Sequence, residues 1–222
     1  HQIYKNKKLK ISNKKILKNF NFKSSLKNEK QKNYFENRLI LKKIFGKAKL
    51  VKFDGLTIDT RTLKKDNLFL CIKGKNRDGK EFINEAIKKD AGCIVSSSIH
   101  KKKNKKIIKT KNVISFLNRF AKLKRNFTSA KIIAITGSAG KTSLKNMLND
   151  LLLVFGKTYS SPKSFNNHLG VPVSLSNLSS SDEFGIFEVG MSRAGEIKKL
   201  SKLIRPHIGV ITNIGEAHLE NF

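Results

Sequence analysis

The sequence predicts an α/β protein in which a small mixed α/β domain precedes a domain built on a parallel sheet. Strand and helix patterns alternate regularly from Lys131 onward, and this alternation is typical of a parallel sheet covered by helices on both faces. A glycine-rich turn at residues 136–142 joins one of these strands to the next helix. With 222 residues, of which 38% are hydrophobic, the chain is long enough to bury a core in each part.

The first segment, residues 1–37, is polar and rich in lysine, with weak hydrophobic periodicity. The stretch "SSLKNEKQKN" has the composition of a linker. We therefore expect a basic extension or linker over residues 1–37. The sequence contains neither a run of about 18 apolar residues nor an apolar signal core near its start, so we expect a cytoplasmic protein without membrane insertion.

The next segment, residues 38–127, predicts a small α/β domain. It contains the strand-like runs "LTIDT", "NLFLCIKG" and "CIVSS" and the helical pattern "GKEFINEAIKKDA". The run "KKKNKK" is most simply a solvated loop, and "VISFLNRFAKLKRNF" has apolar residues at helical spacing. Cys71 and Cys93 fit no metal-ligand spacing and lie in apolar runs, which indicates buried reduced thiols.

The last segment, residues 128–222, has the most regular pattern. Its expected strands are "KIIAIT", "KTYSS", "FGIFEVG" and "HIGVITNI", and the helices between them are "GKTSLKNMLNDLLLVF", "GVPVSLSNL" and "GEIKKLSKLI". In parallel sheets of this kind, ligands bind beyond the carboxyl ends of the strands. Polar residues at those ends are therefore the candidate site residues.

The formal charge of +31 is compatible with nucleic-acid binding, because Lys and Arg neutralise phosphates. The excess is Lys spread along the whole chain, together with many Asn and Ile residues, and the interleaved aromatic residues are mainly Phe in apolar patterns. A compositional bias explains this charge as well as a binding face does. We expect no nucleic-acid partner.

The segment "TGSAGKT" at residues 136–142 is typical of a phosphate-binding loop. Its glycines permit a tight turn whose N–H groups point at the mouth of a helix, where the helix dipole favours an anion. The strict pattern G-x-x-x-x-G-K-[ST] requires glycine at position 135, which is Ile135 here, so the loop is a shortened variant. Lys141 would reach the terminal phosphates and the Thr142 hydroxyl a magnesium ion, whereas the alternative is an ordinary glycine turn.

Other polar residues follow later strands of the same domain. Glu188 is either a solvated strand end or an oxygen ligand for the magnesium that accompanies a nucleotide. His218 alone reads as a surface histidine, but with Glu188 it becomes a candidate second metal ligand. Asn166 and Asn167 in "SFNNHLGVP" either cap a turn or contact a ligand.

In their order and spacing, "TGSAGKT", "NNHLGVP", "EVGMSRAGEI" and "PHIGVITNIGEAHLENF" resemble the motifs of the Mur ligases, ATP-dependent amide-forming enzymes of peptidoglycan synthesis. The run "TIDTRTLKKDNLFLCIKGKNRDGKEFINEAIKKDA" resembles the nucleotide-sugar-binding domain found in that family. The resemblance covers residues 39–222. It is strongest to the branch whose substrates are UDP-N-acetylmuramoyl-tripeptide and D-alanyl-D-alanine.

The resemblance implies ATP and Mg²⁺ as cofactors and gives roles to individual residues. The catalytic residues would be Lys141, Glu188 and His218, and the metal ligands Thr142, Glu188 and His218. The residues that bind ATP would be Gly137, Ser138, Ala139, Gly140, Lys141, Thr142, Ser143 and Asn167. The residues that bind the substrate would be Thr60, Arg61, Asn76, Asn166, Ser192 and Arg193.

The resemblance also implies a reaction. The γ-phosphoryl group of ATP would move to the peptide carboxylate of the UDP-sugar substrate and give an acyl phosphate. The amine of D-alanyl-D-alanine would then attack the acyl carbon, form the amide and release phosphate. We expect the full-length enzyme to be monomeric.

Two features depart from the family pattern. The sequence stops at Phe222, before the family's modified lysine, which helps to hold a second magnesium ion, and before its C-terminal domain, so we expect this piece alone to be inactive. At the other end, "HQIYKNKKLKISNKKILKNF" resembles the closing residues of the neighbouring ligase that adds the third residue, which suggests a junction between two fused ligases.

Two other functions stay open on the sequence. One keeps the ATP site but changes the substrate, as in the ligase that adds the third residue or in folylpolyglutamate synthetase, although the Asn-Asn pair and "EVGMSRAGEI" disfavour both. The other is a basic nucleic-acid-binding module that contains a similar glycine turn.

Overall fold

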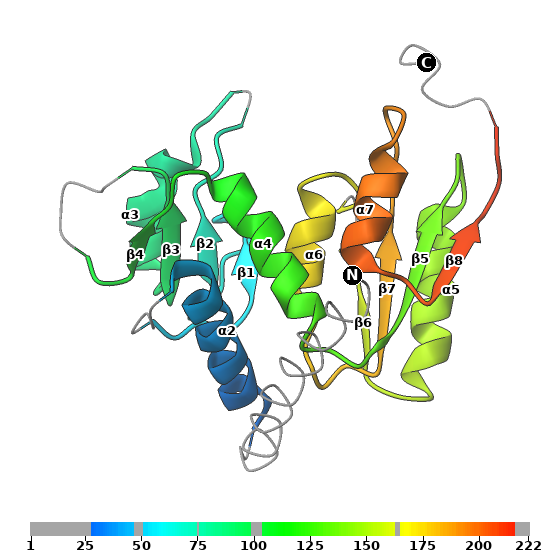
Figure 1. The fold of residues 1–222 in the computed structure, drawn as a ribbon, viewed down its shortest axis with the longest axis horizontal. Coiled ribbons are helices and arrows are strands. Elements are labelled where there is room, and N and C mark those ends of the chain that lie inside the picture. The colour runs from blue at the N-terminus through cyan, green and yellow to red at the C-terminus, as the bar shows by residue number, and fades with distance from the viewer. Residues whose placement is uncertain (1–27, 47–50, 75, 99–103, 163–164, 216–222) are drawn as a thin grey trace, which may run out of the picture.

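The fold is described from a computed structural model, which describes residues 28–46, 51–74, 76–98, 104–162 and 165–215 and confirms the predicted α/β class. Two four-stranded sheets lie side by side, and in both of them all neighbouring strands run parallel (Figure 1). The first sheet has the order β1 (Leu56–Thr57), β2 (Leu68–Leu70), β3 (Cys93–Ser96), β4 (Ile107–Lys109). The second has the order β6 (Thr158–Ser160), β7 (Phe184–Glu188), β5 (Lys131–Thr136), β8 (Ile208–Ile211).

Helices lie before, between and after these strands. The N-terminal half contains α2 (Glu29–Phe45), the 3-10 helix η1 (Gly79–Phe82), α3 (Ile83–Lys88) and α4 (Val113–Arg125). The second half contains α5 (Lys141–Leu153), α6 (Gly170–Asn177) and α7 (Glu196–Ile204). All the strands and helices that the sequence predicts for residues 131–211 are present.

Helix α2 corrects the expectation of a linker over residues 1–37, because its residues 29–37 are helical and packed. The Asn28 side chain caps its start by accepting a hydrogen bond from the N–H of Gln31, and Gly46 ends it in the left-handed conformation that glycine adopts most readily. The helix buries Ile40 and Leu41 in the first core. Residues 1–27, including the stretch that resembles the end of a neighbouring ligase, lie outside the described residues.

The first sheet packs its apolar side chains against α2 and α4. This core includes Phe53, Phe116 and Phe120, whose rings form a chain with centroids 5.9 Å apart.

Strand β4 was not expected, because it is only three residues long and follows a lysine-rich loop. Cys71 and Cys93 are buried thiols that no disulfide joins, and burial raises the pKa of Cys71 to about 12.

The second sheet is covered on both faces. Helix α5 packs Leu144, Leu148 and Leu152 against one face. Helices α6 and α7 pack against the other face. The register places Ile135 of β5 beside Glu188 of β7, so the ends of these central strands lie together.

Helices α4 and α6 form the layer that joins the two halves (Figure 1). Phe120 of α4 belongs to the first core, and Ala121 beside it belongs to the second. In α6, Val173 belongs to the first core, whereas Val171 and Leu175 belong to the second. The two halves therefore share one apolar layer.

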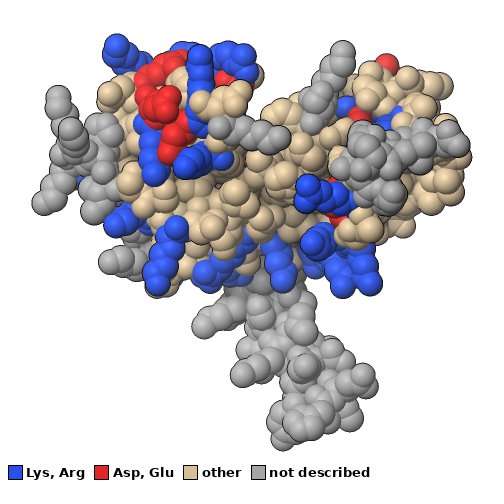
Figure 2. Space-filling view, turned by 90° about the horizontal axis from the view of Figure 1, so that it is seen from above, with Lys and Arg blue, Asp and Glu red and all other residues tan. Residues whose placement is uncertain are grey.

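The basic side chains on the face in Figure 2 lie along one long edge, which crosses both halves, and around an acidic group over the N-terminal half. No helix within the described residues is long and apolar enough to cross a membrane.

Candidate phosphate-binding site

The glycine-rich loop lies between β5 and α5, as the sequence predicts. Gly137 has φ +135°, and a Cβ there would lie 2.1 Å from the Thr212 hydroxyl, so only glycine fits. Gly140 has φ +78° and precedes the first residue of α5. The first N–H groups of a helix have no partner within it, so those of Lys141, Thr142 and Ser143 can receive an anion.

The segment that follows β8 holds the loop from its other side. Ser138 donates its N–H to the carbonyl of Asn213 at 3.2 Å, and Ala139 donates its N–H to Asn213 Oδ1 at 2.8 Å. The Thr212 hydroxyl donates to the carbonyl of Ala139 at 2.5 Å. The loop therefore owes its shape to the strand beside it as well as to its glycines.

The Lys141 ammonium lies within the curve of this loop. Its Nζ donates to the carbonyls of Gly137 at 2.5 Å and Ser138 at 3.3 Å. Both contacts are with the loop itself, so the ammonium is placed where a phosphate seated on the helix mouth would meet it. This location fits the predicted role.

Glu188 ends β7 beside the loop and is almost fully buried. Its Oε2 accepts from the Thr142 hydroxyl at 2.9 Å, and its Oε1 accepts from Asn166 Nδ2 at 2.9 Å. Lys145 Nζ lies 3.6 Å from Oε2, and both of these side chains are at most 5% exposed. The structure therefore places two predicted site residues, Thr142 and Asn166, against the carboxylate of a third, Glu188.

The contacts around Glu188 keep it charged. Burial raises the pKa of this carboxyl, but hydrogen bonds from Asn166 and Thr142 and the positive charges of Lys145 and Lys141 outweigh burial, so the pKa lies below its ordinary value. An ionised carboxylate next to a hydroxyl offers the hard oxygen ligands that Mg²⁺ prefers. The residues present therefore fit a magnesium ion.

The remaining residues predicted around ATP and the peptide lie at the starts of α6 and α7. Asn167 Oδ1 accepts from the N–H groups of Leu169 and Gly170 at 3.0 and 2.9 Å, which caps the first turn of α6. Ser192 and Arg193 donate their N–H groups to Glu196 Oε2.

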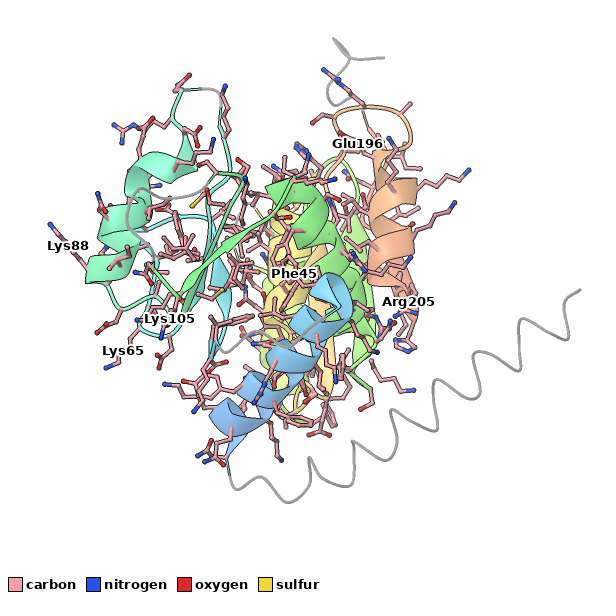
Figure 3. The ribbon with its side chains drawn as sticks, turned by 60° about the vertical axis from the view of Figure 1, so that its left-hand side comes forward. Phe45, Lys65, Lys88, Lys105, Glu196 and Arg205 are labelled. Atoms are coloured by element: carbon pink, nitrogen blue, oxygen red, sulfur yellow. The ribbon has the colours of Figure 1, made fainter. Side chains whose placement is uncertain are left out.

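Glu196 lies at the start of α7, at the opposite end of the helix from Arg205 (Figure 3). The backbone hydrogen bond from Ser192 is the main reason why the pKa of Glu196 lies below its ordinary value.

The predicted substrate residues of the N-terminal half follow its first two strands, with Thr60 and Arg61 after β1 and Asn76 after β2. Thr60 is buried and donates its hydroxyl to Glu85 at 3.0 Å. Arg61 is 87% exposed and pairs with Asp59, with Nη2 2.6 Å from Oδ2. Asn76 is exposed in the turn between Lys73 and Asp78. The guanidinium of Arg61 is thus accessible to an anionic substrate.

Two outcomes complete the comparison with the sequence. His218 lies outside the described residues, so its role stays a prediction. Lys145 and Ser161 were not identified as site residues from the sequence. The Ser161 hydroxyl accepts a hydrogen bond from the N–H of Glu188 at 3.1 Å. Lys145 stands four residues after Lys141 and so shares its helix face, which was the available signal.

A glycine loop opening a helix, with an ionised carboxylate on the neighbouring parallel strand, defines the class of phosphate-binding α/β proteins. Two sequence profiles identify the family more narrowly. The Mur ligase family catalytic domain matches residues 52–127, and the Mur ligase middle domain matches residues 135–222.

Relatives with known names agree with these profiles. The chain is 40% identical over 173 residues to the UDP-N-acetylmuramoyl-tripeptide--D-alanyl-D-alanine ligase of Rickettsia prowazekii, covering 78% of this chain and 38% of that protein. It is 34% identical to the ligase of the same name from Borreliella burgdorferi, covering 83% of this chain and 45% of that protein. The chain therefore spans less than half the length of the curated relatives it matches.

Solved structures show the same similarity. A crystal structure of MurF from Acinetobacter baumannii has a TM-score of 0.72 at 26% identity, covering 83% of this chain and 42% of that one. MurF ligase from Thermotoga maritima, solved in complex with ADP, has a TM-score of 0.63 at 29% identity, covering 75% of this chain and 39% of that one. The chain belongs to the Mur ligase family.

Proposed function

We propose that this chain is part of an ATP-dependent ligase that joins D-alanyl-D-alanine to UDP-N-acetylmuramoyl-tripeptide. The names of the relatives supply the substrates, and the ADP complex of the Thermotoga maritima protein supports a nucleotide at the glycine loop. The observation that carries the proposal is the meeting of Lys141, Thr142 and Glu188 at the mouth of α5.

The loop would bind the β- and γ-phosphates of ATP through the N–H groups at the start of α5. Lys141 would exchange its two carbonyl contacts for phosphate oxygens and would stabilise the negative charge that develops as the γ-phosphoryl group moves. The phosphoryl group forms a bond to the peptide carboxylate, the bond to ADP breaks, and an acyl phosphate results. The incoming amine then attacks the acyl carbon, releases phosphate, loses a proton and leaves the amide.

Thr142 and Glu188 would hold a magnesium ion, with His218 as a further candidate ligand. When bound, this ion would neutralise phosphate charge during transfer. Asn166 and Lys145 fix the orientation of the Glu188 carboxylate, since they approach it from two sides.

The N-terminal half would bind the UDP-sugar part of the substrate. Arg61, which is exposed beside Asp59, would pair with a phosphate of this nucleotide, because a guanidinium forms strong charge-assisted hydrogen bonds with phosphate. Thr60 lies beside it in the same loop.

The loop assignment is tested in the full-length protein with the variant Lys141→Ala. We expect phosphate release in the presence of all substrates to fall by about 10²-fold or more, because a charge aimed at the transferring group is lost, while the melting temperature stays unchanged. Lys131→Ala, at the exposed start of the adjoining strand, is the matched control and should keep full activity. Near-normal turnover in Lys141→Ala would rule out the assignment.

The metal assignment is tested with Glu188→Gln, which keeps the size of the side chain and removes its charge. We expect the magnesium concentration for half-maximal activity to rise by about tenfold or more. Glu183→Gln, in the residue just before β7, is the control. An unchanged magnesium titration in Glu188→Gln would show that the carboxylate only ends a strand.

A further inference from the structure

Asn177, the last residue of α6, joins the two halves through a paired backbone contact. Its Oδ1 accepts from the N–H of Leu56 at 2.7 Å, and its Nδ2 donates to the carbonyl of Leu56 at 2.9 Å. Strand β1 pairs with β2 on its other side. The carboxamide thus occupies the open edge of β1 and satisfies both polar groups of one residue, as a neighbouring strand would.

The other end of α6 lies at the phosphate site. Asn167 caps its first turn, and Asn166 donates to the Glu188 carboxylate. Every residue of α6 before Asn177 is buried. A short helix enclosed along its whole length moves as one body with the elements that pack on it.

The segment clamped by Asn177 leads directly into the candidate substrate loop. Leu56 stands in β1, and Asp59, Thr60 and Arg61 follow within five residues. The Thr57 hydroxyl accepts the N–H of Asp59 at 3.1 Å, which ties the loop to the strand. One helix therefore connects the residues around Glu188 to the residues around Arg61.

We propose that α6 is a strut that sets the position of the substrate loop relative to the phosphate site, and that Asn177 is the positioning residue at its joint with β1. The inference rests on the proposed function, because that reaction requires a group held by one half to meet a phosphate held by the other. Reacting atoms must be held about 3 to 3.5 Å apart, and a displacement of about 1 Å can cost about 10²-fold in rate. Asn177 belongs to neither the phosphate site nor the substrate loop, and it acts through Leu56.

Two variants of the full-length protein separate positioning from stability. Asn177→Asp keeps an acceptor for the Leu56 N–H but places carboxylate oxygen against the Leu56 and Val173 carbonyls, to which Nδ2 donates. Asn177→Ser removes both contacts with Leu56. The matched control is Asn118→Asp on α4, whose carboxamide donates to the carbonyl of Ile114 in its own helix.

We expect kcat at saturating substrates to fall by about tenfold or more in both Asn177 variants. Dissociation constants for ADP and for UDP-N-acetylmuramoyl-tripeptide, measured by calorimetry, should each change by less than about threefold, because each half-site keeps its own contacts. Asn118→Asp should match the unaltered protein. An unchanged kcat would overturn the inference, and so would a fall in kcat that comes only with weaker ADP binding and a lower melting temperature.

A distance measurement tests the strut without relying on the reaction. Nitroxide labels on Lys88→Cys of α3 and Lys202→Cys of α7 report the relative position of the halves, since both residues are exposed and the native thiols are buried. We expect one narrow distance distribution, at least doubled in width by Asn177→Asp or Asn177→Ser and unchanged by Asn118→Asp. Equal widths in the unaltered protein and the three variants would overturn the proposal that α6 is a strut. If the unaltered protein shows no ligase turnover but the Asn177 variants still broaden the distance distribution, only the proposed function is overturned.

Discussion

The two sheets have the same number of strands and the same parallel pairing, but they differ in how their apolar residues are covered. Among the described residues of the N-terminal half, Ile114 is the one large apolar side chain that is clearly exposed. In the second half, α5 exposes Met147 and Leu151, and the turn that follows it exposes Val154 and Phe155, with Val154 81% exposed. Ile208 and Ile211 of β8 are exposed as well.

Both sheets are covered by helices, so the difference lies in the apolar residues that stay exposed on α5, in the turn after it and on β8. Helix α5 has apolar residues on two faces, and the sheet covers only the row formed by Leu144, Leu148 and Leu152. A helix that is apolar on two faces is typical of one covered on both.

The greatest loss of stability is expected from a substitution of Phe120 in the first core. Phe120→Ala should lower the free energy of unfolding by about 3 to 5 kcal/mol, because the ring is 1% exposed and packs against two other rings. Phe155→Ala, in the exposed turn after α5, should change it by less than about 0.5 kcal/mol. Denaturant titration of the 222-residue chain measures both, and equal losses would show that the halves do not differ.

A slightly smaller effect sharpens the role of α2 in closing the first core. Lys124 of α4 pairs with Glu36 of α2 at 2.9 Å, and these side chains are 4% and 0% exposed. Lys124→Met leaves a buried carboxylate without its cation, so we expect a loss of about 3 kcal/mol. The double variant Lys124→Met with Glu36→Leu should recover most of it; if it stays as unstable as the single variant, the ion pair is not the cause.

The smallest effect is expected from the exposed pair Lys30–Asp66 in the same half. The hydrogen bond from Lys30, aided by one from Tyr34, holds the pKa of Asp66 below its ordinary value against the opposing effect of burial. The pair therefore stabilises the fold above the ordinary carboxyl pKa, and this contribution disappears as the pH falls through the lowered value.

Asp66→Asn should change the unfolding free energy at neutral pH by no more than the uncertainty of a denaturant titration, because exposed pairs contribute little. The difference should vanish in acid. A loss as large as that of Lys124→Met would contradict this reading.

The sequence was most informative where local pattern alone decides the structure. The alternation of strands and helices over residues 131–211 was predicted because each element carries its own periodicity. Helix α2 was missed because its stability depends on burying Glu36 against Lys124, which stands 88 positions later. No local pattern contains that information.

The candidate site divides in the same way. Lys141, Thr142 and Glu188 follow from a motif and from the end of a strand, so their meeting could be predicted. Asn177 could not be recognised, because its partner Leu56 stands 121 positions earlier and offers only backbone atoms. Lys145 was hidden for a related reason, since a lysine in a helix is normally solvated and this one is buried against Glu188.

The contacts that Thr212, Asn213 and Gly215 make with the glycine loop have a consequence for the order in which the chain folds. Among the described strands of its sheet, β5 is made first but lies between β7 and β8, so one of its edges stays unpaired until β8 has been synthesised. The Ser138 hydroxyl bonds to the carbonyl of Gly215, 77 positions further on. Contacts of such long sequence separation form late, because the intervening chain must first be ordered. A motif that is continuous in sequence thus reaches its final shape only after β8 and the residues that follow it have been ordered.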